Sequence, residues 1–380
     1  MSFLCPMLKK RPFTELYIHI PFCAGKCDYC AFYSEKNMEE TLLEKYLEKL
    51  FSHMEENAPL CKVLRSIYFG GGTPTLLPPE KMEKLFQKIR QNFTFEENIE
   101  ITMECNPSSL TEEKSMVMGS FVNRVSMGVQ SFSPVFRERI GRREPNKNIE
   151  KTVENAITLL NKNSIFNIGL DLIYFLPGQT LEDWKKDLQT AVSFPVKHLS
   201  CYSLTLEEGT LLAEKYITEK DESLSADMWE FAGEYLKEKG FSRYEISNYA
   251  KENFHCRHND NIWKGAAYLG LGPSACSFDG KDRWTQYSPL GGFLAGKEPE
   301  KDIVEDETRL AEMFIMGLRK VSGWTKEDWE KVSGGISFDS LWRKTIEKNI
   351  LHNLLHRKGE SLFPTEKGLE FWNDLAESFL

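Results

Sequence analysis

The stretch YIHIPFCAGKCDYC, residues 17–30, places three cysteines on one short loop directly after a β-rich run. Cys23, Cys27 and Cys30 follow the spacing C-x3-C-x2-C. Three thiolates at this spacing can wrap one face of a cubane iron–sulfur cluster and ligate three of its four irons, with Gly25 easing the turn. A structural zinc ion is the alternative, but zinc prefers four protein ligands and no second paired-cysteine motif supplies the fourth. The loop therefore predicts a cluster with one open iron.

Outward from this loop, short β-rich runs alternate with helical patterns as far as residue 204. The runs are YIHI (17–20), SIYFGG (66–71), IEITME (99–104), RVSMGV (124–129), IGLDLIY (168–174) and HLSCYSL (198–204). Apolar residues three and four positions apart predict helices at 38–56, 79–92, 148–161 and 180–192. The alternation predicts a parallel sheet with helices outside it. Six units are too few for a closed eight-unit barrel, so we expect an α/β fold built as a partial (β/α)6 barrel, with active-site residues at the carboxyl ends of its strands.

The pattern changes after the sixth unit, and we expect four parts in the chain. They are a lead-in at 1–15, the partial barrel at 16–215, a covering segment at 216–299 and a mostly helical domain at 300–380, for which a winged helix is one fitting form. The covering segment begins with an amphipathic helix at 222–239 and continues as an aromatic-rich stretch. In the last domain we expect helices at 310–320, 337–358 and 365–379.

Composition and charge narrow the class of protein. Hydrophobic residues make up 41% and charged residues 28% of the 380 positions, as in ordinary soluble globular proteins. The formal net charge of −9 and the lack of a strongly basic C-terminal helix argue against nucleic acid as a partner. The N-terminus lacks a signal peptide's apolar stretch and no run reaches the ~18 apolar residues that span a bilayer, so we expect a cytoplasmic protein. In that compartment the nine cysteines are thiols or metal ligands.

The cysteine spacing after a first strand is the signature of the radical S-adenosylmethionine (SAM) superfamily, and residues 17–30 resemble its HemN/HemW branch. The resemblance spans most of the chain. It implies a [4Fe-4S] cluster whose open iron chelates the amino and carboxylate groups of SAM. In such proteins the reduced cluster passes one electron to the sulfonium, which yields methionine and a 5′-deoxyadenosyl radical, while the protein supplies positioning.

The resemblance also assigns SAM contacts to positions along the first five strands. They are Tyr17, Gly71, Gly72, Thr73, Glu104, Gln130, Arg142 and Asp171. Each has a simpler interpretation beside this one: Tyr17 as a core aromatic, the glycine run as a tight turn, and Glu104 as an exposed acid at a strand end. Their order along successive strands favours the cofactor interpretation.

Two functions of different classes fit this branch. One is a heme chaperone that binds heme and passes it to respiratory or other heme proteins, and the other is an oxygen-independent coproporphyrinogen III dehydrogenase of porphyrin biosynthesis. The dehydrogenases of the branch carry a fourth cysteine where this chain has Phe32, and a longer segment before the position of Tyr17. Residues 258–263, HNDNIW, resemble the HNxxYW motif associated with heme binding. These features favour the chaperone.

The motif makes His258 the candidate heme ligand, because imidazole nitrogen is a common axial ligand of heme iron. His255 and Cys256 are alternatives, and a histidine that only makes structural hydrogen bonds is a further one. The expected partners are heme or a porphyrin, a protein reductant, and heme-accepting proteins that include membrane-associated ones. Whether SAM is cleaved stays open at this point.

Overall fold

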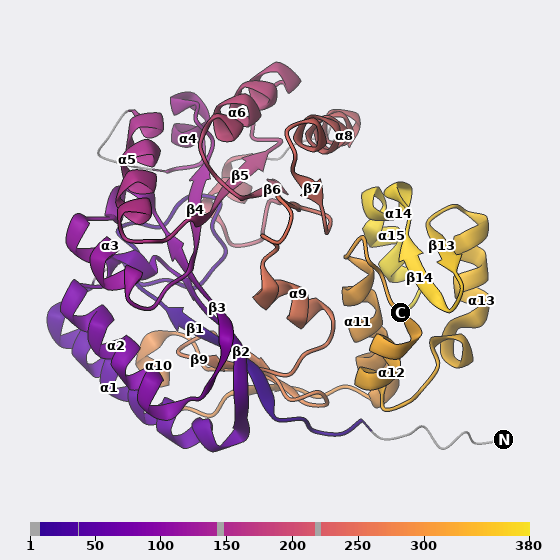
Figure 1. The fold of residues 1–380 in the computed structure, drawn as a ribbon, viewed down its shortest axis with the longest axis horizontal. Coiled ribbons are helices and arrows are strands. Elements are labelled where there is room, and N and C mark those ends of the chain that lie inside the picture. Colours follow the sequence, from indigo (N-terminus) through magenta and orange to yellow (C-terminus); the bar gives the residue numbers. More distant parts are fainter. Residues whose placement is uncertain (1–7, 37, 143–147, 217–221) are drawn as a thin grey trace.

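In the computed structural model, residues 8–36, 38–142, 148–216 and 222–380 are described. Six parallel strands form its centre, and all six lie where the sequence predicts them. They are β1 (Phe13–Ile20), β2 (Cys61–Gly71), β3 (Phe95–Cys105), β4 (Arg124–Gln130), β5 (Asn167–Tyr174) and β6 (His198–Ser203). The helices between them are α1 (Glu40–Asn57), α2 (Pro79–Asn92), α3 (Glu112–Gly119), α4 (Pro134–Arg139), α5 (Ile149–Lys162) and α6 (Leu181–Ser193). They cover the outer face of the sheet (Figure 1).

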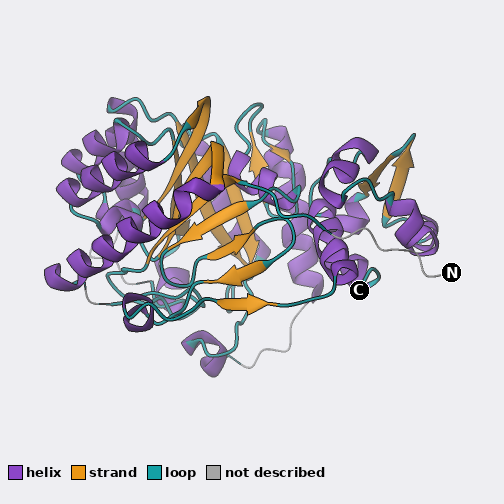
Figure 2. Cartoon of the chain, turned by 90° about the horizontal axis from the view of Figure 1, so that it is seen from below, coloured by secondary structure: helices purple, strands orange, loops and turns teal. Residues whose placement is uncertain are grey.

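The sheet continues beyond both ends of this parallel array. Its order is β12-β11-β10-β9-β1-β2-β3-β4-β5-β6-β8-β7. Strand β9 (Tyr268–Leu271) pairs in parallel with β1, and this seventh parallel strand is absent from the sequence-based prediction. The others are β7 (Ser242–Arg243), β8 (Asn248–Ala250), β10 (Cys276–Phe278), β11 (Arg283–Thr285) and β12 (Glu300–Asp302). Because β1 pairs with β9 rather than β6, the barrel stays open, and Figure 2 shows the strands as one curved layer.

Alternation along the strands separates an apolar face from a polar one. On β1, Leu16, Ile18 and Ile20 belong to the main hydrophobic core with the inward faces of the surrounding helices. The intervening Tyr17 and His19 point to the concave face, where Tyr17 stacks on Tyr68 of β2. Successive residues of a strand point to opposite faces, so the concave face of the barrel is lined with polar and aromatic side chains.

Four further helices belong to the segment around the sheet: α7 (Leu211–Lys215), α8 (Glu222–Glu238), α9 (Arg257–Trp263) and α10 (Leu290–Leu294). The helix predicted at 222–239 is confirmed as α8. Helix α9 packs against β1 and β2 and also against the last domain, so it lies between the two (Figure 1). No helix among the described residues is both long and apolar enough to cross a membrane.

The last domain has its own hydrophobic core, centred on Phe314, Trp324 and Trp329. Its elements are α11 (Asp306–Leu318), α12 (Lys326–Ser333), α13 (Phe338–Leu351), β13 (Leu355–Lys358), β14 (Ser361–Pro364), α14 (Glu366–Glu370) and α15 (Trp372–Glu377). Three helices followed by a two-stranded antiparallel hairpin are the arrangement of a winged helix.

Two sequence-based predictions in this domain were wrong. The helix predicted at 337–358 ends at Leu351, and residues 355–358 form strand β13. Asn353 adopts a left-handed φ of 58°, which terminates the helix and turns the chain back. The single helix predicted at 365–379 is two short helices, because Phe371 leaves the helical conformation between them.

Candidate cofactor-binding site

The three cysteines lie on the loop that follows β1, and backbone hydrogen bonds fix this loop from several sides. Cys23 N donates to Glu35 O at 2.9 Å, and Cys30 N donates to Cys27 O at 3.2 Å. All three thiols are partly exposed and none forms a disulfide. Burial raises the pKa of Cys30, and the neighbouring thiolates of Cys27 and Cys23 raise it further. The three sulfurs therefore lie close enough to interact electrostatically.

This donor set fits an iron–sulfur cluster better than a single metal ion. Among the described residues, no three His, Cys, Asp or Glu side chains converge so as to hold one ion. A cubane cluster needs no such convergence, because each thiolate binds a different iron.

The glycine run that ends β2 lies directly against the cysteine loop. Gly72 N donates to Ile20 O at 2.7 Å, and Thr73 N donates to Phe22 O at 2.8 Å. The Thr73 hydroxyl lies 3.5 Å from Cys23 Sγ. A Cβ on Gly72 would come within 2.5 Å of the carbonyl oxygen of Phe22, so the close approach of the two segments requires glycine. The run therefore does more than turn the chain, because it holds the ligand loop in place.

Glu104 lies on the concave face beside this turn and is partly buried. Its carboxylate accepts hydrogen bonds from Tyr68 Oη at 3.1 Å and from Gly71 N at 3.2 Å. Burial raises the pKa of Glu104 to about 7, and the nearby carboxylate of Asp171 contributes to the rise. The interpretation of Glu104 as an exposed strand-end acid does not hold. A partly buried carboxylate with spare acceptor capacity is suited to binding hydroxyl groups.

The remaining predicted contacts converge on the same end of the barrel. Arg142 donates to the carbonyl oxygen of Gly128 and is hydrogen-bonded to Tyr29 in the cysteine loop. Gln130 ends β4 with a left-handed φ of 71°, and its amide lies 3.0 Å from the place where a Cβ on Gly128 would stand. Asp171 accepts a hydrogen bond from Ser126 Oγ at 3.0 Å, and burial raises its pKa.

Sequence reasoning missed His19, which shares the concave face with Tyr17. The ring accepts a hydrogen bond from Tyr17 Oη at Nδ1 (3.2 Å) and donates from Nε2 to the carbonyl oxygen of Tyr33 (3.1 Å). Burial lowers the pKa of His19 to about 4, so the ring is neutral near pH 7 and its tautomer is fixed. The available signal was the two-residue spacing of Tyr17 and His19 on one strand.

His258 lies further toward the amino ends of the strands than the other predicted residues do, beside the middle of β2. Its ring is buried, Nδ1 lies 2.7 Å from Ser66 Oγ, and its backbone N donates to Glu100 Oε1 at 3.0 Å. Burial lowers the pKa of this imidazole to about 3. Ser66 pairs in register with Glu15, four residues before His19 on β1, so roughly 13 Å of strand separates His258 from the cofactor end. The Tyr68 ring lies between the two places: its centroid is 5.2 Å from that of His258, and its hydroxyl donates to Glu104. His258 thus does not contact the other predicted residues directly, but one aromatic side chain connects it to Glu104.

The two alternative ligands beside His258 differ in accessibility. Cys256 is buried, and burial raises its pKa to about 12. The side chain of His255 is 42% exposed, stacks face to face on Tyr244 with ring centroids 4.1 Å apart, and lies 3.6 Å from Asp260 Oδ2. His255 is thus the accessible member of the three.

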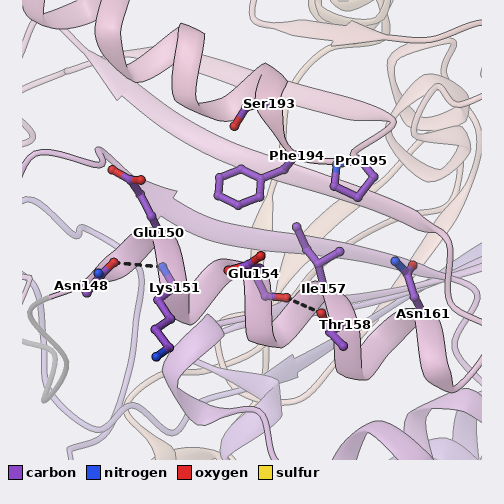
Figure 3. A pocket seen from close by; sticks show the side chains of 10 residues that line it. All are labelled: Asn148, Glu150, Lys151, Glu154, Ile157, Thr158, Asn161, Ser193, Phe194 and Pro195. Atoms are coloured by element: carbon purple, nitrogen blue, oxygen red, sulfur yellow. Dashed lines mark hydrogen bonds between the residues drawn. The ribbon is translucent and has the colours of Figure 1, made fainter.

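A groove of about 640 Å³ lies on the outer helical layer, well away from these residues (Figure 3). It is lined by one face of α5, by Ser193 at the end of α6 and by Phe194 and Pro195 after it. None of the predicted site residues lines it, and it lacks clustered groups for cofactor chemistry. The candidate site is therefore the concave carboxyl end of the strands.

Known proteins are similar to this chain over nearly its whole length. Residues 17–191 match the radical SAM superfamily, and residues 304–371 match the HemN C-terminal domain. The chain is 33% identical to heme chaperone HemW of Lactococcus lactis, over 97% of each chain. It is 31% identical to heme chaperone HemW of Escherichia coli, over 98% of this chain and 99% of that one. Coproporphyrinogen III oxidase (HemN) from Escherichia coli has the same fold, with a TM-score of 0.82 at 20% identity over 97% of this chain and 90% of that chain.

Proposed function

This chain belongs to the HemW family within the radical SAM superfamily, and we propose from that membership that it is a heme chaperone which holds a [4Fe-4S] cluster and SAM. The observation that best supports this proposal is the position of the cysteine loop. Hydrogen bonds fix it against the glycine turn at the carboxyl ends of parallel strands. Cys23, Cys27 and Cys30 would ligate the cluster. Bound SAM would supply a source of an adenosyl radical there when the cluster is reduced by a protein donor.

The chain's own groups around the loop are suited to hold SAM. Glu104 offers carboxylate oxygens for ribose hydroxyls, and Tyr17 is held in place by its hydrogen bond to His19. The glycine turn offers backbone groups at close approach, and the Gln130, Arg142 and Asp171 side chains surround the remaining space.

Heme is proposed as cargo, bound at the α9 end of the barrel. The near-full-length likeness to proteins named heme chaperones supports heme as the cargo. The α9 end is proposed because residues 258–263 of the heme-associated motif lie there. A heme iron can reach His255 in the structure as it stands. It reaches His258 only when α9 leaves β1 and β2, because that ring is buried against Ser66. From this end the protein would pass heme to acceptor proteins.

The deciding experiment is anaerobic cluster reconstitution followed by three parallel assays: heme titration, SAM cleavage and consumption of coproporphyrinogen III. We expect one heme per chain and no protoporphyrinogen. His255→Ala should weaken heme binding at least tenfold if His255 is the axial ligand, while His258→Ala serves as the matched variant for the buried candidate. Circular dichroism and thermal unfolding control for folding. Protoporphyrinogen formation without heme uptake would identify the dehydrogenase instead.

Glu104 should make SAM binding depend on pH. Its pKa is raised from 4.5 to about 7, so between these values the folded chain binds more protons than the unfolded one. Stability linked to this group is therefore present below about pH 4.5 and lost as the pH rises to 7, by about 3 kcal/mol. Ribose hydroxyls prefer the ionised carboxylate, so SAM affinity should rise as the pH increases through 7. Glu104→Gln should remove this dependence, as measured by equilibrium binding from pH 6 to 8. An unchanged pH profile in the variant would exclude Glu104 as the titrating group.

A further inference from the structure

Asp28 stands between two of the cysteine ligands and is fixed through both its backbone and its side chain. Its N–H donates to Ile140 O at 3.0 Å, and its carbonyl oxygen accepts from Leu212 N at 2.8 Å. Leu212 lies in the first turn of α7, where backbone N–H groups have no partner within the helix. The loop between Cys27 and Cys30 is thus joined to two segments that are distant in the sequence.

These segments pack on a small hydrophobic cluster of their own. It consists of Phe136, Ile140, Ile173, Leu176 and Leu212, and Tyr29 of the cysteine loop packs against it. The cluster is separate from the main core of the barrel. The conformation of the ligand loop therefore depends on whether α7 stays packed on this cluster. Leu212 is the residue of α7 that is buried in it.

An ion pair strengthens the attachment. Lys215 Nζ, at the end of α7, pairs with Asp28 Oδ2, and the two side chains are 55% and 10% exposed respectively. The Asp28 carboxylate lies directly against Gly141, where an added Cβ would stand 2.2 Å from Asp28 Oδ1. The position of this carboxylate therefore requires glycine at position 141. A mostly buried carboxylate whose cation is removed keeps its desolvation cost and loses the compensating attraction.

We propose that Lys215 and Asp28 act as a clasp that holds α7 on the ligand loop and keeps the three thiols placed for the cluster. Both are positioning residues, since Asp28 acts through Cys27 and Cys30 and Lys215 acts through Asp28. The inference rests on the proposed function, because it presupposes that the loop binds a cluster. Its distinguishing consequence is that a charge on exposed Lys215, which is not itself a ligand, controls how long the cluster survives.

The test is a charge series at Lys215 in the full chain: Lys215→Arg, Lys215→Met and Lys215→Glu. After anaerobic reconstitution, iron per chain is measured, and loss of the visible absorbance is followed in excess chelator. We expect the arginine variant to match the wild type, the methionine variant to lose its cluster about tenfold faster, and the glutamate variant to lose it faster still. The electron paramagnetic resonance spectrum of the reduced cluster should change in the last two variants only.

Lys162→Met is the matched control, because Lys162 is 65% exposed and pairs with Glu112 of α3 on the helical layer. It should keep the wild-type lifetime and spectrum. Equal lifetimes in the Lys215→Met, Lys215→Glu and Lys162→Met chains, with a normal cluster in the wild type, would overturn the clasp alone. A wild-type chain that takes up no iron would overturn the proposed function, and the clasp with it.

Discussion

Cys27→Ala is expected to abolish the broad visible absorbance of the anaerobically reconstituted chain while the protein stays folded and soluble. With Cys27 removed, only two thiolates remain to ligate the cluster, and solvent would occupy the other iron positions. Bound iron should therefore fall to near zero. The fold should survive because Cys27 is only partly buried on a loop and belongs to none of the hydrophobic cores. The measurements are iron and sulfide per chain, the visible spectrum, and thermal unfolding of the iron-free protein.

Cys61→Ala is the matched control for this result. Cys61 is also a partly buried free thiol, but it begins β2, whereas the ligand loop lies beside the strand's other end. The control should load as much iron as the wild type. If the Cys27→Ala chain kept an iron-loaded spectrum, the assignment of the three cysteines as ligands would be refuted.

Gly72→Ala is expected to abolish both SAM binding and stable cluster uptake. The added Cβ would stand 2.5 Å from Phe22 O and 2.9 Å from Ile20 O, and neither backbone atom can move aside without displacing the ligand loop. The hydrogen bonds from Gly72 N and Thr73 N to that loop would lengthen or break. We expect SAM affinity to fall by at least a hundredfold, about 3 kcal/mol, as measured by equilibrium dialysis under anaerobic conditions.

Gly25→Ala provides the contrasting substitution within the cysteine loop. No heavy atom lies within 4 Å of a Cβ at this position, and its φ is not in the left-handed region. The variant should bind SAM and the cluster as the wild type does, although Gly25 stands nearer the ligands in the sequence. Equal loss in both variants would mean that the loop tolerates no side chain at all, and that the contact at Gly72 is not the cause.

The features that could be predicted from the sequence are those with a local signal. The cysteine spacing, the glycine run and the alternation of strands and helices are all read within short windows, and the partial barrel is confirmed. The left-handed Asn353 that ends α13 also had a local signal, because asparagine favours this conformation after a helix. It was missed because the apolar spacing continues through Leu354 and Leu355 into β13.

The features that could not be predicted depend on pairing between distant segments. Nothing in Tyr268–Leu271 indicates that this run pairs with β1. The motif at His258 carries no signal that its imidazole packs on Ser66, 192 positions earlier, rather than facing solvent. In the same way, an ordinary lysine at position 215 gives no sign of its pairing with Asp28. Such contacts arise only when the sheet and α9 are assembled.

The late position of β9 in the chain has a consequence for biosynthesis. Strand β1 carries the ligand loop, yet one of its two neighbours is translated roughly 200 residues after the other, or about 10 to 40 s later at ordinary rates of synthesis. During that interval one edge of β1 has unpaired backbone groups on the nascent polypeptide. The strand that carries the ligand loop therefore gains its second neighbour only after most of the polypeptide has been made.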